Sequence, residues 1–303
     1  MSPRLASLLA FCALLAIPHS AWAWGPGMHL ELALHCLEHL DIATPALAAL
    51  LKEFPYDFMY GAVSPDIFLS KMRAGALFHC HNWRMGHLLL SEAENDRLRA
   101  AVYGYLVHLA ADVVAHNYFV PYKIIANYSA RISSHLYWEM RYDLTVANHT
   151  WRVVPRIVQG DYQEFDALLE RVLKKTLFSF RTSKRIFQSL LVVNRIGRVR
   201  ASLRAYTKRS RLPLHEKRIM HFRDLTIDLV EDFLRHPDTA RCLEGDPTGR
   251  PRESAARQLR KRMRRAMERG ELTKNRATQF IAHCDERLRN SMCQADIEWP
   301  NID

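Results

Sequence analysis

Apolar residues recur at helical spacing along most of the chain, and this pattern predicts a protein built of α-helices. In one such stretch Leu98, Ala101 and Tyr105 are three and four residues apart, so they share one face of a helix. The predicted amphipathic helices cover residues 29–52, 97–118, 163–177 and 218–235.

Loops are predicted where prolines, glycines and polar residues interrupt this pattern. They fall at Pro55–Asp66, residues 78–87, the surroundings of Pro121, Pro155–Gly160 and Asp246–Pro251. Alternating apolar runs separated by Asn-Gly or Gly-Gly turns, which would predict hairpins, are absent from the sequence, and 11 glycines are few for a β protein. We therefore predict an all-α helical bundle with a basic helical C-terminal extension.

The N-terminus has the pattern of a secretory signal peptide. Arg4 precedes a short apolar run at residues 8–17, and Ala21-Trp-Ala23 is an Ala-x-Ala site of the kind that signal peptidase cuts. The run is shorter than the roughly 20 residues that span a bilayer. We predict cleavage after Ala23 and export to the periplasm or the medium. The mature chain would then begin at Trp24, whereas an uncleaved anchor would leave Trp24 without a free amine.

Composition bounds the class of protein. The chain is 49% hydrophobic and 25% charged, which is typical of a globular protein rather than a disordered one. Outside the leader we expect no apolar run long enough to cross a membrane. Five cysteines remain after the leader, and an odd number leaves at least one thiol unpaired. Cys284 and Cys293 are close enough in sequence to bridge, but sequence does not determine their pairing.

The formal net charge of +11 favours anionic partners such as lipid headgroups, nucleic acid or cell-wall polymers. Much of the excess lies in residues 252–269, which are rich in arginine. Residues 184–200 combine basic and apolar side chains, so this segment either lies on an anionic membrane or packs as a helix with solvated arginines.

The strongest chemical signal is His108-x-x-x-Asp112-x-x-x-His116. Four-residue spacing places the three side chains in one stripe of a helix. Imidazole and carboxylate are ordinary zinc ligands, and this helix is otherwise apolar, so the stripe faces the interior. Burying these groups without partners would be costly, which favours a metal site.

Further donors lie in the same half of the chain. His135 and Glu139 are again one helical turn apart, His79 and His81 flank Cys80, and Asp66 ends the segment Tyr60-Gly-Ala-Val-Ser-Pro-Asp66. The Trp24 amine and His29 complete a set of candidate ligands near the mature N-terminus. Each isolated histidine has an ordinary alternative as a core or surface residue. His79 competes with His81, and His35 and His39 compete with His29.

The ordered set of donors resembles the zinc-dependent phospholipase C family, which shares its fold and trinuclear zinc site with the S1/P1 nucleases. The donors in question are Trp24, His29, Asp66, His81, His108, Asp112, His116, His135 and Glu139. The matching motifs end near Asp143. The resemblance implies a signal peptide (1–23), a catalytic domain (24–160) and a basic helical region (161–303) that completes or extends it.

The resemblance also implies how up to three zinc ions would be held. One would take Asp66, His81, His108 and Asp112. A second would take His116, His135 and Glu139. A third would take the amine and carbonyl of Trp24, His29 and the other oxygen of Asp112. Asp66 would also orient or deprotonate the attacking water. Only three residues separate Asp112 from His116, whereas the well-known secreted relatives have five.

The function that this resemblance implies is an exported phosphodiesterase that hydrolyses phospholipid to diacylglycerol and a phosphorylated headgroup by a zinc-activated water. The alternatives are a single-strand nuclease, and a non-catalytic protein that binds lipid or an anionic polymer and keeps zinc for structure. Peripheral contact with an anionic membrane is expected. Five aromatic residues flank the site in sequence and would seat a choline, stack a base or form core: Phe58, Tyr60, Phe68, Phe78 and Trp83.

Overall fold

The computed structural model describes residues 24–68, 79–130, 135–173, 179–208, 214–294 and 296–300. Within these ranges the side chains of residues 135–137, 139, 206 and 208 are not described. The predicted signal peptide and Phe78 therefore lie outside the described residues, as do the side chains of His135 and Glu139.

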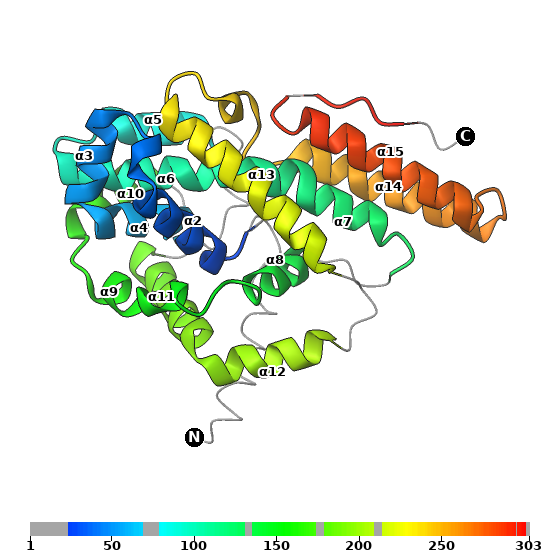
Figure 1. Ribbon diagram of the computed structural model, residues 1–303, viewed down its shortest axis with the longest axis horizontal. Coiled ribbons are helices and arrows are strands. Elements are labelled where there is room, and N and C mark those ends of the chain that lie inside the picture. Colours follow the sequence, from blue (N-terminus) through cyan, green and yellow to red (C-terminus); the bar gives the residue numbers. More distant parts are fainter. Residues whose placement is uncertain are drawn as a thin grey trace.

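Every regular element in these ranges is a helix, which confirms the predicted all-α fold (Figure 1). The first elements are α2 (Pro26–Glu38), η1 (Leu40–Ile42), α3 (Pro45–Glu53), α4 (Pro55–Val63), η2 (Ser64–Ile67), α5 (Trp83–Ser91), α6 (Asp96–Val114), η5 (Ala115–Phe119), α7 (Val120–Ala126) and α8 (His135–Asp143). They continue with η6 (Thr150–Arg152), α9 (Val154–Gln159), α10 (Gln163–Val172), α11 (Phe180–Arg195), α12 (Gly197–Lys208), α13 (Glu216–Arg235), η7 (Arg241–Glu244), α14 (Arg250–Glu268) and α15 (Lys274–Ser291).

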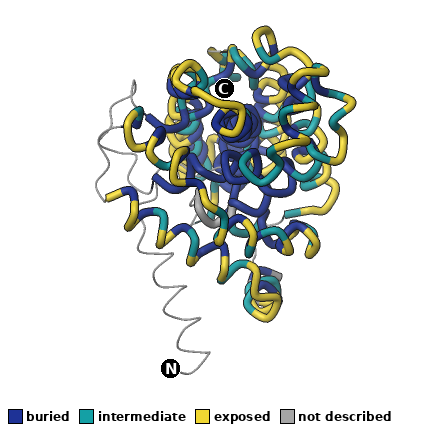
Figure 2. Tube along the Cα trace, turned by 90° about the vertical axis from the view of Figure 1, so that its left-hand side faces the viewer, coloured by how far each residue is buried: buried dark blue, intermediate teal, exposed yellow. Residues whose placement is uncertain are grey.

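Helix α6 forms the centre of the bundle. Almost all of its residues from Leu98 to Val114 are buried, and α4, α5 and α13 pack around it. The tube in Figure 2 shows this buried centre enclosed by exposed outer helices. One continuous hydrophobic core runs from Trp24 to Leu288, so helices after residue 160 contribute to the same core as those before it. The division of the chain at residue 160 stays a prediction.

The segment Asp96–Ala126, which joins α6, η5 and α7, is long and apolar enough to cross a membrane by length and composition. Our expectation that no such run exists outside the leader was therefore wrong. However, 89% of its most apolar window is buried inside the protein, as expected of a central core helix.

Glycines allow α4 and α6 to approach backbone to backbone. A Cβ placed at Gly61 would lie 1.8 Å from the carbonyl oxygen of Ala101, and one at Gly104 would lie 2.0 Å from the carbonyl oxygen of Phe58. No real Cβ contact is that short, so any side chain at either position would push the two helices apart.

We expect Gly104→Ala to lower the free energy of unfolding by about 3 kcal/mol, because overpacking between two backbones cannot relax by a rotamer change. Gly197→Ala is the matched control, since a Cβ at Gly197 meets nothing within 4 Å. Urea denaturation of both variants measures the difference. Equal stability of the two variants would contradict the close approach of α4 and α6.

Several segments predicted as loops are helices, because proline was interpreted as a helix breaker. Pro55 and Pro155 occupy the first turns of α4 and α9, whereas Pro121 follows the π-helical turn η5 inside the continuous helix of residues 96–126. A first-turn residue has no intrahelical acceptor for its N–H, so proline is tolerated there. The segment Pro55–Asp66 is thus α4 followed by η2. Of the predicted loop at residues 78–87, the described part becomes α5 from Trp83 onward.

The predicted helix over residues 29–52 is divided into α2, η1 and α3. The break lies at residues 39–44, where Thr44 caps α3 by accepting a hydrogen bond from the Leu47 N–H. The predicted helices at 97–118 and 218–235 correspond to α6 with its π-helical continuation and to α13.

The basic C-terminal extension is a helical hairpin. Helices α14 and α15 pack against α7 and extend to one end of the molecule, on the right of Figure 1. Cys284 and Cys293 do not bridge, because all five cysteines from Cys36 onward are free thiols.

Candidate metal centre

Helix α6 and its continuation carry the stripe of donors. His108 and Asp112 lie on α6 with side chains that are 0% and 1% exposed. His116 is the second residue of η5, a π-helical turn that directly continues α6. Such turns widen the helix and occur frequently at functional sites. The π-helical turn accommodates the gap of only three residues between Asp112 and His116, because the His116 Nε2 still lies 3.6 Å from Asp112 Oδ2.

Carboxylates and imidazoles from three separate segments converge on His81 and His108. His81 Nε2 and His108 Nε2 are 3.0 Å apart, and each lies 3.2 Å from Asp112 Oδ2. Asp66 Oδ1 lies 3.5 Å from the His81 nitrogen and 3.9 Å from the His108 nitrogen. Zinc bonds of about 2.0–2.1 Å in a tetrahedron separate two ligand atoms by about 3.3 Å. The spacings among His81, His108 and Asp112 fit three ligands of one ion, and Asp66 brings a donor atom within 4.8 Å of both His29 and His108.

The two oxygens of Asp112 face different histidines. His29 Nε2 lies 3.5 Å from Oδ1, whereas His81, His108 and His116 approach Oδ2. Within the described residues, neither oxygen of Asp112 and neither ring nitrogen of His29 has a hydrogen bond. Buried polar groups of this kind normally have partners, so these unpaired atoms suit the binding of a metal cation.

The electrostatics of the cluster favour a cation. Burial alone would raise the pKa of Asp112, but the neighbouring His108 imidazole holds it well below its usual range, so the group stays a carboxylate. Burial lowers the pKa of His29, and the stacked His108 ring lowers it further. Although burial alone would lower the pKa of His108, the carboxylates of Asp112 and Asp66 raise it above its ordinary value. Bound zinc would replace the protons that this pair of carboxylates attracts.

The Ala62 carbonyl is a functional group that sequence reasoning missed. His108 Nδ1 donates a hydrogen bond of 2.9 Å to this oxygen, so the ring proton is on Nδ1 and the Nε2 lone pair faces the cluster. Two lone pairs on His108 and His81 only 3.0 Å apart require a proton or a cation between them. No sequence signal identifies a backbone carbonyl in this role, because it depends on the close approach of α4 and α6.

The geometry distinguishes His81 from His79. His79 Nδ1 accepts a hydrogen bond of 3.1 Å from the backbone N–H of His81, so this lone pair is used. The His81 Nε2 instead points into the donor cluster. Tyr105 donates from its hydroxyl to the Cys80 carbonyl and thus attaches the loop to α6. His79, Cys80 and His81 also bring their donor atoms within 4.8 Å of one another.

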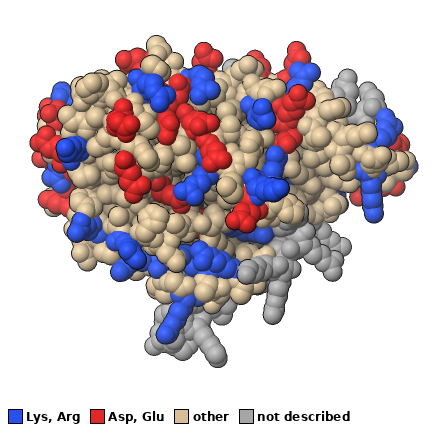
Figure 3. All heavy atoms as spheres, viewed as in Figure 1, with Lys and Arg blue, Asp and Glu red and all other residues tan. Residues whose placement is uncertain are grey.

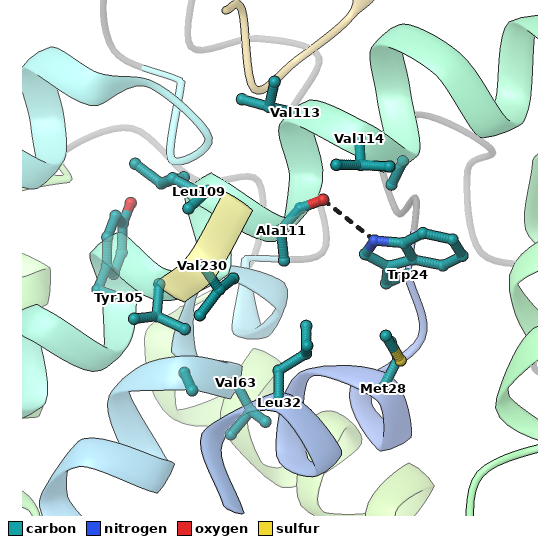
Figure 4. Close-up of a cluster of buried hydrophobic side chains, with 14 of the residues drawn as sticks. Trp24, Met28, Leu32, Val63, Tyr105, Leu109, Ala111, Val113, Val114 and Val230 are labelled. Atoms are coloured by element: carbon teal, nitrogen blue, oxygen red, sulfur yellow. Dashed lines mark hydrogen bonds between the residues drawn. The ribbon is translucent and has the colours of Figure 1, made fainter. Parts of the chain in front are cut away.

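Trp24 is fully buried beside the cluster. Its indole stacks on Phe119 at a centroid distance of 4.9 Å and contacts Tyr142 at 4.3 Å. Its Nε1–H donates a 3.0 Å hydrogen bond to the carbonyl of Ala111, the residue before Asp112 (Figure 4). The indole of Trp24 is therefore held next to the helix turn that carries Asp112.

Asp143 anchors the start of α2, and it was not recognised from the sequence. Its two carboxylate oxygens accept hydrogen bonds of 2.9 and 3.0 Å from the backbone N–H groups of Gly27 and Met28. Asp143 ends α8, four residues after Glu139 and eight after His135. The repeated four-residue spacing of His135, Glu139 and Asp143 is the sequence pattern that could have identified Asp143 as part of the site. Helix α8 carries both Asp143 and the predicted ligands His135 and Glu139. It therefore connects these two ligands to the segment that carries Trp24 and His29.

A loop from the C-terminal half closes over His116. The Asn117 side chain donates to the Asp246 carbonyl, and the Trp83 indole donates to the Gly245 carbonyl, both at 2.8 Å. Gly249 has a φ of +52°, and a Cβ there would lie 2.5 Å from the Cβ of His116. Only glycine fits this contact without strain.

The remaining candidates lie elsewhere. His35 Nε2 is 2.8 Å from Glu231 Oε1 and its ring contacts His39, so both histidines are outside the cluster. Phe58, Tyr60 and Phe68 are buried in the core. Their burial favours the core interpretation over an aromatic pocket for choline or a base.

Lys123 on α7 is a buried cation close to α8. It is 4% exposed, and its Nζ lies 4.9 Å from the centre of the Trp138 ring. Burial, together with the nearby charges of Arg218 and Arg141, lowers its pKa to about 8.

We expect Lys123→Met to stabilise the protein at neutral pH. The folded pKa lies below the unfolded one, so burying Lys123 destabilises the fold below about pH 8, and this penalty vanishes as pH rises through 10.5. The gain at pH 7 is expected to reach about 3 kcal/mol. Denaturation from pH 7 to 10.5 measures it, with the exposed Lys261→Met as control. A gain independent of pH would contradict the shifted pKa.

The fold and the cluster together define an all-α protein with a buried set of imidazole and carboxylate donors, which is the ligand chemistry that zinc prefers. The sequence matches the family model for zinc dependent phospholipase C over residues 28–185, more than half of the chain. The chain belongs to this family, which confirms the resemblance seen in the order of its donors. Among curated proteins and solved structures none matches significantly.

Proposed function

We propose that the protein is an exported phosphodiesterase that hydrolyses phospholipids to diacylglycerol and a phosphorylated headgroup. The observation that carries this proposal is the division of the Asp112 carboxylate between His29 on one oxygen and His81, His108 and His116 on the other. A bridging carboxylate places metal ions close enough to act on one phosphate.

The described residues that would hold zinc are Asp66, His81, His108 and Asp112 for one ion, and His29 with the other oxygen of Asp112 for another. Cleavage after Ala23 would add the amine and carbonyl of Trp24 to the second of these, and the hydrogen bond of the buried indole to the residue before Asp112 supports this assignment. His116, with His135 and Glu139 from α8, would hold a further ion. Zinc in these positions supplies Lewis acidity that activates water and neutralises charge on the phosphodiester.

The chain itself contributes orientation and proton transfer. Hydrogen bonds from His108 to Ala62, from Tyr105 to Cys80, and from Gly27 and Met28 to Asp143 fix three donor segments before substrate binds. Asp66, on the short η2 turn at the edge of the cluster, would orient the attacking water and accept its proton.

Product analysis tests this proposal. The zinc-loaded mature protein is incubated with mixed phospholipid vesicles and single-stranded DNA together, and the products are identified by mass spectrometry. Diacylglycerol is the expected product, and the released headgroup identifies the preferred lipid. Nucleotides instead of diacylglycerol would assign the chain to nuclease chemistry, and no product from either would favour a binding protein. Either of these outcomes would overturn the proposal.

A further inference from the structure

The chain between Glu170 and Glu216 contains no acidic residue, although lysines and arginines recur throughout it. Helices α11 and α12 form the described centre of this stretch, joined at an elbow by Ile196. The metal centre uses none of their side chains. A long segment of one charge sign on a folded surface attracts partners of the opposite sign.

Helix α11 buries only one of its faces. Phe187, Leu190 and Leu191 are buried against the body of the protein. The opposite face begins at Arg185, and seven and eleven residues later, on the same side, come Val192 and Ile196. These two aliphatic side chains are 43% and 46% exposed, more than large apolar residues normally are in a packed helix.

We define the elbow surface by six exposed residues: Arg185, Ile186, Val192, Arg195, Ile196 and Arg198. Its three arginines form no ion pair with any described residue. Neighbouring cations have partners within the protein. Lys184 forms an ion pair with Asp166. Arg200 donates to the Asn148 side chain, and Arg204 donates to the Leu144 carbonyl. These buried and half-buried cations attach the elbow to the body, and the exposed arginines remain available.

The two helices that meet at the elbow are attached to segments that carry or follow metal ligands, and α11 makes this contact through its N-terminal end at Phe180. Helix α11 packs on η2, which carries Asp66, and the Phe180 ring contacts the Phe68 ring at 5.5 Å. Through Arg204 and Arg200, α12 is attached to the residues that follow α8. In Figure 3 the lower margin, where α11 and α12 lie in Figure 1, shows blue and tan atoms without red.

We propose that the elbow surface seats the protein on an anionic phospholipid bilayer. Its arginines would contact the headgroups, and Ile186, Val192 and Ile196 would enter the boundary between headgroups and acyl chains. The idea that this contact presents lipid to the metal centre rests on the proposed function. The binding of the elbow surface to a membrane does not depend on it.

The exposed aliphatic side chains distinguish a bilayer from nucleic acid as the partner. Phosphate backbones are contacted through cations and hydrogen bonds, and a single strand adds stacking on aromatic rings. The elbow surface offers exposed isoleucine and valine instead of exposed aromatic rings. The arginines of α14 form a second basic surface with few exposed aliphatics, which provides a control of equal charge.

Vesicle sedimentation with the zinc-loaded mature protein tests the proposal. Wild type is expected to bind vesicles of phosphatidylglycerol and phosphatidylcholine more tightly than vesicles of phosphatidylcholine alone. Each arginine near an anionic surface strengthens binding by about fivefold, so the triple variant R185E/R195E/R198E should bind at least about a hundredfold more weakly. V192S/I196S should weaken binding by about tenfold or more, because two aliphatic side chains no longer enter the bilayer.

Two matched variants control for charge and apolarity. K261E/R262E/R265E on α14 changes net charge equally, and Leu88→Ser removes an aliphatic side chain of 39% exposure from α5. Both should bind vesicles almost as wild type does. Equal loss of binding in the α14 variant, unchanged binding in the elbow variants, or elbow-dependent binding to single-stranded DNA without vesicle binding would each overturn the proposal.

Hydrolysis assays separate this proposal from the proposed function. The elbow variants should lose activity on vesicles but retain it on a short-chain phospholipid below its micellar concentration. If no phospholipid is hydrolysed at all, the proposed function fails, and the sedimentation result still decides whether the elbow binds membranes. Circular dichroism spectra that match those of wild type establish that the variants are folded.

Discussion

Asp112→Asn is expected to lower zinc content and phosphodiesterase activity together, with activity falling by about a thousandfold or more. The carboxylate lies between His29 and three other histidines, so the amide would remove the negative charge at the centre of the donor cluster. Loss of several kcal/mol of charge stabilisation in the transition state corresponds to this decrease in rate.

Metal analysis by mass spectrometry and initial rates on a short-chain phospholipid measure the two effects. The melting temperature should also fall, because buried histidines at positions 81 and 108 would lose their common partner. Asp41→Asn is the control, since Asp41 is an exposed carboxylate on η1. Wild-type zinc content in the Asp112 variant would show that this carboxylate is not a ligand.

Asp66→Asn is expected to reduce activity by about a hundredfold to ten-thousandfold while the fold and most of the zinc persist. The amide keeps one oxygen near His81 and His108, which Asp66 Oδ1 approaches at 3.5 and 3.9 Å. It cannot accept a proton from water at neutral pH. The loss should therefore appear mainly in kcat.

The kinetic measurement is paired with circular dichroism and metal analysis, again against Asp41→Asn. An unchanged rate would refute the role of Asp66 in proton transfer. Loss of zinc in proportion to the loss of rate would instead show that Asp66 acts only as a ligand.

Local pattern was sufficient for the helical fold and for one part of the site. Spacings of three and four residues identified α6 and α13, because a helix repeats every 3.6 residues wherever it lies in the chain. The same rule placed His108 next to Asp112. It failed at Pro55 and Pro155, since a proline suits the first turn of a helix as well as a loop. It also failed at Pro121, which follows a π-helical turn inside a longer helix.

The order of donors along the chain made the family recognisable before any fold was known. It did not distinguish His81 from His79, because that choice depends on which imidazole points away from the loop backbone. In the structure His79 Nδ1 accepts a hydrogen bond from the His81 N–H, and His81 Nε2 faces Asp112 and His108. The exposure of Val192 and Ile196 is likewise decided by packing, because sequence shows an amphipathic helix without showing which neighbours cover it.

By itself the sequence determined the helical class, the stripe of donors on α6 and the family, because these depend on periodicity and on the order of residue types. Tertiary structure alone decided which histidine faces which oxygen of Asp112, and it supplied the Ala62 carbonyl and the Asp143 anchor. Those contacts join segments up to more than a hundred residues apart. Their geometry follows from the close packing of α4 on α6 and the π-helical turn after it, which no local pattern specifies.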